Sequence, residues 1–99
     1  MRADYDSEGK SIQIWLEEVD HLDADDVLLG GHVIVSSVGG RPALVEVHWT
    51  STEPVEKALR AAASAHDLDY EALLAAAEAA LAAPDRIVTL TVAGRLAVG

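Results

Sequence analysis

Histidines and aspartates are the side chains of this 99-residue chain with the clearest capacity for chemistry. His32 begins one aliphatic run and His48 ends the next, so a hairpin turn between the runs would place both imidazoles roughly opposite one another. With His21 or Asp23 nearby, three ligands would converge, which is the minimum that a catalytic zinc site uses. The spacing matches no ligand signature, however, and exposed imidazoles are commonly plain polar surface. We therefore predict no metal and no other cofactor, with His21, His32, His48 and Asp23 as the only metal candidates.

An acidic stretch supplies carboxylates for an enzymatic alternative. The segment "DHLDADD" contains Asp20, Asp23, Asp25 and Asp26, and paired carboxylates can serve as general acid and base. The segment has no apolar period, which is typical of a solvated connection. A metal-dependent or acid–base enzyme that uses the histidines and this loop is the alternative function.

The opening letters "DYDSEG" resemble the first half of a calcium loop. An EF-hand loop needs an apolar residue at its eighth position and a bidentate carboxylate at its twelfth. Counted from Asp4, these positions are Ser11 and Trp15, so both requirements fail. We predict instead a solvated turn before a strand, in which Asp and Gly supply side-chain bonds to the backbone and permissive φ angles.

The charge and composition of the chain limit the classes of partner that it can be expected to bind. The chain has 17 Asp and Glu against 7 Lys and Arg, a formal charge of −10, so phosphate backbones and anionic lipid surfaces repel it. We expect no nucleic acid and no membrane as partner, and a basic protein as the favoured one. There is no cysteine, which excludes disulfides and thiolate chemistry, and the first residues are too polar for a signal peptide. These features predict a cytoplasmic protein.

Hydrophobic periodicity predicts an α+β fold in a single domain, residues 1–99. Alternation in "SIQIWLEEV", "HVIVSSV" and "ALVEVHW" predicts a three-stranded meander over about residues 3–49. The period then changes to that of helices, over about 52–66 and 69–83, and a closing strand follows over about 86–93. The expected architecture is a mostly antiparallel sheet, the meander plus the C-terminal strand, with two helices packed on one face.

Both helices carry start signals. Hydroxyls at residues 50–52 can cap the first helix, and Asp69 can cap the second. The buried stripe expected for the second helix consists of Tyr70, Leu73, Leu74, Ala77 and Leu81.

The turn and first strand also resemble a known family. They are similar to the opening of a small bacterial family, number 2283 in the domain-of-unknown-function series, whose members begin Tyr-Asp-x-Glu followed by a strand of the form aliphatic-x-Ile-x-Leu. The matching positions here are Tyr5, Asp6, Glu8, Ile12, Ile14 and Leu16.

The resemblance extends into the hairpin and covers roughly residues 5–52, about half of the chain. Val33-Ile34, Gly39-Gly40 and Val45-Glu46-Val47 match the family's "VI" strand, Gly-containing turn and Glu between aliphatics. The chain departs from the family in having Ser36-Ser37 where an acidic pair is usual, and in its helices and last strand. The resemblance implies no catalytic residue. It implies a partner-binding role, because some members are thought to be encoded beside small toxin-like proteins.

The leading hypothesis is a non-enzymatic protein-binding or regulatory module, antitoxin-like in its use of an acidic face against a basic protein. Trp15 lies on an otherwise polar strand face, where an aromatic side chain would make a binding anchor. The expected partner surface consists of Trp15, Glu17, Glu46 and His48. A structural homo-oligomer or homodimer, formed when the first or last strand pairs with its copy, is a further alternative.

Overall fold

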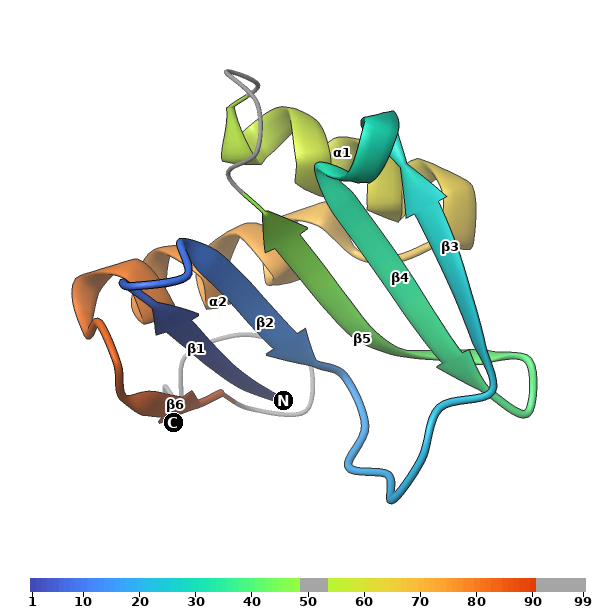
Figure 1. Ribbon diagram of the computed structural model, residues 1–99, viewed down its shortest axis with the longest axis horizontal. Coiled ribbons are helices and arrows are strands. Elements are labelled where there is room, and N and C mark those ends of the chain that lie inside the picture. The colour runs from blue at the N-terminus through green and yellow to red at the C-terminus, as the bar shows by residue number, and fades with distance from the viewer. Residues whose placement is uncertain (49–53, 91–99) are drawn as a thin grey trace.

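An antiparallel sheet of six strands forms the centre of the structure, in the order β3-β4-β5-β2-β1-β6 (Figure 1). The computed structural model describes residues 1–48 and 54–90. The strands are β1 (Arg2–Asp6), β2 (Ser11–Trp15), β3 (Ala24–Leu28), β4 (Val33–Val38), β5 (Arg41–His48) and β6 (Ile87–Thr89), with a 3₁₀ turn, η1 (Leu29–Gly31), between β3 and β4.

The α+β class is confirmed, and the sheet is larger than the four strands that alternation predicts. β1 comes from the stretch expected to be a turn, and β3 from the stretch expected to be a solvated connection. β1 does alternate, with Ala3 fully buried, but its flanking aspartates disguise the pattern. β3 is "ADDVL", whose acids disfavour a strand on propensity alone. Pairing with β4 therefore makes this segment a strand, because its own side chains are mostly exposed.

The chain crosses between two hairpin units. After β2, residues 16–23 pass around the tip of the β4–β5 hairpin and enter β3 (Figure 1). β5 then returns to pair with β2, so β2 is an internal strand between β5 and β1. The first strand predicted from the sequence, an expected edge for self-association, is therefore internal. Among the strands of the described residues, β3 and β6 lie at the edges.

One face of the sheet forms the hydrophobic core. Helices α1 (Val55–His66) and α2 (Tyr70–Ala82) both cover this face (Figure 1). The fully buried strand residues on it are Ala3, Ile12, Ile14, Val33, Val35, Val45 and Val47. The strand residues between them, such as Gln13, Ile34 and Glu46, point to the other face.

The predicted turn before the first long strand is confirmed as a side-chain-stabilised turn. The Asp6 Oδ1 atom accepts the N–H groups of Glu8 and Gly9, both at 3.0 Å. A Cβ atom at Gly9 would lie 2.7 Å from Asp6 Oδ2, so a larger residue here would displace the Asp6 carboxylate. Asp85 ties the turn to the start of β6 by accepting from the Ser7 N–H at 2.9 Å and the Ser7 hydroxyl at 2.6 Å. These bonds, the hydroxyl's first, lower the pKa of Asp85 below its usual value.

The observed helix boundaries agree with the predicted ones within one residue, except at the start of α1. α1 begins after Pro54, and the hydroxyls at 50–52 lie outside the described residues. Asp69 caps α2 by accepting the Ala72 N–H at 3.2 Å, as predicted. β6 occupies only Ile87–Thr89 of the predicted closing strand, and residues 91–93 lie outside the described part.

The buried stripe of α2 is rotated relative to the prediction. Leu73 is 1% exposed, but Leu81, expected in the stripe, is 36% exposed. The remaining buried residues of α2 are Ala72, Ala76, Ala77 and Ala80. Alanines face the core because their small side chains let the helix backbone approach β1, β2 and α1 closely, and the wider leucine is directed outward.

Leucine truncations in α2 test this rotation. Leu73→Ala is expected to lower the free energy of unfolding by about 2–5 kcal/mol, because it leaves a cavity in the core. The same change at Leu81 is expected to cost less than about 1 kcal/mol, since that side chain is already partly solvated. Urea denaturation of both variants gives the comparison, and equal losses would contradict the observed orientation of α2.

Candidate functional site

The sheet face opposite the helices carries a continuous row of residues across all six strands. Strand register places them side by side, apolar at both edges and polar in the middle: Ile87, Asp4, Gln13, Glu46, Ile34 and Val27. Ile87 and Val27 are 62% and 57% exposed. Partial burial raises the pKa of Asp4, a shift that Arg2 opposes and Asp6 reinforces. Neither helix of the described residues covers this face, which we call the open face, and it combines exposed aliphatic side chains with carboxylates (Figure 1).

A second row runs parallel to the first and contains Trp15. Its members are Thr89, Arg2, Trp15, Leu44, Ser36 and Asp25. Trp15 is half-buried and not freely exposed, because the Arg2 guanidinium lies over its ring at 5.4 Å from the centroid. Leu44 and Ser36 are buried, next to the point where the Leu16 N–H donates to the Ala43 carbonyl at 2.8 Å.

A groove of about 240 Å³ adjoins Trp15 at the end of β1 and β2. The Arg2 Nε atom lies 3.2 Å from Glu18 Oε1 across it, an ion pair whose geometry is too oblique for a hydrogen bond. The groove thus offers an aromatic and aliphatic floor beside two carboxylates. Its lining consists of Met1, Arg2, Trp15, Leu16, Glu17, Glu18 and Thr89.

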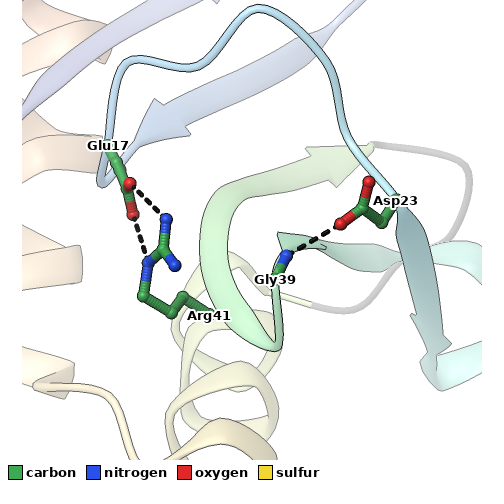
Figure 2. A network of polar contacts seen from close by, with 4 residues as sticks. All are labelled: Glu17, Asp23, Gly39 and Arg41. Atoms are coloured by element: carbon green, nitrogen blue, oxygen red, sulfur yellow. Dashed lines mark hydrogen bonds and ion pairs between the residues drawn. The ribbon is translucent and has the colours of Figure 1, made fainter.

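Glu17, a predicted partner-surface residue, lies in the connection between β2 and β3 and is held by an arginine. The Arg41 Nη2 and Nε atoms donate to its two carboxylate oxygens at 2.8 and 3.2 Å (Figure 2). These bonds, with the charge of Arg41, lower the pKa of Glu17. On the other side of the hairpin tip, the Asp23 carboxylate accepts the Gly39 N–H at 2.8 Å (Figure 2). Glu17 and Asp23 thus fix the connection around the tip.

Glu46 and His48, the other two predicted surface residues, lie on the open face of β5. They share this face because residues two apart on a strand point the same way. The His48 Nε2 atom lies 3.6 Å from Glu46 Oε2, and both side chains are half-buried. Trp15, Glu46 and His48 therefore occupy one face as the alternation predicts, and Glu17 lies beside it.

His32 is a buried structural residue and not a surface imidazole. As predicted, it lies opposite His48, whose N–H donates to the His32 carbonyl at 2.8 Å. Its side chain is fully buried, with Nδ1 at 2.7 Å from the His48 carbonyl oxygen and Nε2 at 3.3 Å from that of Pro54. The imidazole therefore lies between the end of β5 and the start of α1, with each ring nitrogen facing a backbone carbonyl oxygen.

The metal candidates do not converge. His21 is exposed and lies 3.4 Å from Asp23, beside the hairpin tip. His32 and His48 lie at the opposite end of β4 and β5, roughly 20 Å away over six residues of strand. Within residues 1–48 and 54–90, no three His, Asp or Glu side chains gather in a group that could hold a metal ion.

The acidic stretch enters the edge strand β3 only from Ala24 onward, and the carboxylates of Asp25 and Asp26 contact separate partners. Asp25 accepts the Ser36 hydroxyl at 2.7 Å, and Asp26 lies 2.8 Å from His66 Nε2 on α1. The carboxylates are therefore divided between the two faces and do not form a pair for acid–base work. The contact of His66 with Asp26 is not predictable from the sequence, because no local pattern links residues 40 positions apart.

Truncation of His32 tests its structural role. His32→Ala is expected to lower the free energy of unfolding by about 2–4 kcal/mol, because it removes the contacts of the imidazole with two backbone carbonyls and leaves a buried cavity. His21→Ala, at an exposed imidazole, is expected to change it by less than about 0.5 kcal/mol. Thermal and urea denaturation measure both, and a small loss for His32→Ala would contradict the link between β5 and α1.

Comparison of the chain with protein-family models, with curated proteins and with solved structures finds no match. Neither of the helices in the described ranges is long and apolar enough to cross a membrane. The candidate site is therefore identified from the geometry of this chain alone. It is the open face of the sheet, where both rows of residues lie.

Proposed function

We propose that this protein is a non-enzymatic binding module whose open sheet face takes up a basic partner protein. The observation that carries the proposal is the pair of rows across this face, which bring aliphatic and aromatic side chains together with carboxylates. Asp4, Glu46 and Asp25 accompany a single guanidinium, that of Arg2, in these rows. Such a mixture suits a partner that brings both apolar side chains and positive charge.

Trp15 is the proposed anchor of this interface. It is half-buried beside a groove, so a partner side chain can complete its burial at little cost in Trp15 side-chain entropy. Arg2 already holds the indole in place from one side. Glu46 and His48 lie on the same face and would form part of the polar rim. The net charge of −10 would steer a basic protein toward this surface.

The resemblance to family number 2283 supports the same class of function. That family implies a partner-binding role and no catalytic residue, and the matched residues include Glu46 on the open face. An antitoxin-like protein that neutralises a basic partner is the form of regulation that we propose.

Charge-reversal variants with affinity purification test the proposal. Wild-type protein is expected to retain a basic protein from the native host at moderate salt, where contacts between well-separated exposed charges are screened over about 8–10 Å. Glu46→Lys on the open face is expected to abolish this retention, because it places a positive charge opposite the partner's own.

Glu78→Lys is the matched control. Glu78 is exposed on α2, which covers the other face of the sheet, and the substitution changes the net charge by the same amount. Retention by Glu78→Lys together with loss by Glu46→Lys would support a defined face. Equal loss in both variants would show that only bulk charge matters, and the absence of any retained basic protein would remove the support for the proposal.

A further inference from the structure

The outer side of β3 is an unpaired strand edge with exposed apolar side chains. Within residues 1–48 and 54–90, β3 is the terminal strand of the sheet and pairs with β4 on one side only (Figure 1). In an antiparallel pair, alternate backbone N–H and C=O groups point away from the partner strand, so β3 presents a row of main-chain donors and acceptors. The residues Ala24–Val27 are all exposed, and Val27 is 57% exposed.

The segment after β3 is held in a backbone conformation that its residue type disfavours. Leu29 has a φ of 51° and remains 42% exposed. A leucine in the left-handed region costs conformational energy, and its exposure means that burial of its side chain does not offset that cost. Gly30 and Gly31 continue the turn with positive φ angles. Val27 and Leu29 thus form an exposed apolar pair at this corner of the sheet.

The charge on β3 disfavours a second copy as the occupant of this edge. A two-fold antiparallel pairing centred on Asp25 or Asp26 would place carboxylates of the two copies opposite one another, and like charges at directly opposed positions are destabilising. Both chains would also carry a net charge of −10. An extended segment with positive charge would instead place opposite charges at these positions, which is stabilising.

We propose that β3 accepts an extended basic segment of the partner protein by strand addition, which specifies the binding mode of the function proposed above. In an antiparallel addition the segment presents an aliphatic residue opposite Val27 and then Lys or Arg opposite Asp26 and Asp25. The Asp25 side lies on the open face, and the Asp26 side faces α1 next to His66. The segment would extend the open face by one strand, so both surfaces serve a single partner.

A synthetic heptapeptide is the probe for this edge. The acetylated and amidated sequence Thr-Thr-Val-Arg-Arg-Thr-Thr places valine and the two arginines in the required antiparallel order. At a peptide concentration ten times its Kd, only about a tenth of the protein is unbound, so exchange of the amides of Ala24–Leu28 that point outward is expected to slow about tenfold. Amide shifts in an NMR titration should map to β3 and η1.

A backbone-blocked peptide separates strand addition from charge attraction. The control peptide has the same sequence, but the backbone nitrogen of each arginine is methylated. This change keeps the charge of the side chains and removes the main-chain donor that must face β3. It is expected to bind at least about tenfold more weakly. Equal binding of the two peptides would overturn the proposal.

Matched variants at the two edges complete the test. Val27→Lys is expected to weaken peptide binding about tenfold, and Ile87→Lys, at the other end of the same row, to change it less than about twofold. Equal weakening, or the absence of binding, would overturn strand addition. Shifts confined to Trp15 and Glu46 would overturn it and leave the open-face function standing. A concentration-dependent dimer that Val27→Lys abolishes would also overturn it, because a second copy would then occupy the edge.

Discussion

The pairing of β2 with β5 is the constraint on which the rest of the structure depends. It places Ile12 opposite Val47 and Ile14 opposite Val45, joining the β1–β2 hairpin to the meander of β3, β4 and β5. Because side chains alternate, this single register fixes two surfaces together: a continuous apolar layer under the helices and a continuous mixed row on the open face. The crossing connection that permits the pairing is stabilised at the hairpin tip by Glu17 and Asp23, and the buried imidazole of His32 stabilises the opposite end.

The sequence predicts those elements whose local pattern agrees with their environment. Alternation identifies β2, β4 and β5 because these strands are buried on one face, and the helix of residues 70–82 is identified by its Asp69 cap. β3 has no such pattern, since an edge strand with both faces exposed has little selection for alternation. The rotation of α2 is also unpredictable, because alanine-rich stripes are defined by how closely a helix approaches its neighbours and not by the size of its leucines.

The sequence predicts those parts of the candidate site that follow from the alternation of side chains along a strand. Trp15, Glu46 and His48 share the open face because alternation places them there. His32 is different: the hairpin predicts its position opposite His48, but the side chain turns toward backbone carbonyls at the start of α1, which only tertiary packing determines. The partners of Glu17 and Asp26 likewise lie 24 and 40 residues away in the sequence. The resulting surface combines aliphatic, aromatic and acidic residues, and recognition of a basic partner there is our proposal.

A through-space measurement on β2 and β5 tests this account most directly. If the register is correct, the NMR spectrum of the free protein contains interstrand nuclear Overhauser effects that connect Gln13 with Glu46, Ile12 with Val47 and Ile14 with Val45. The amides of both strands should then be among the slowest to exchange, as expected for the centre of a sheet. Absence of these contacts, with β2 connected only to β1 and its amides exchanging rapidly, would show that the two hairpin units do not form one sheet and that the continuous open face does not exist.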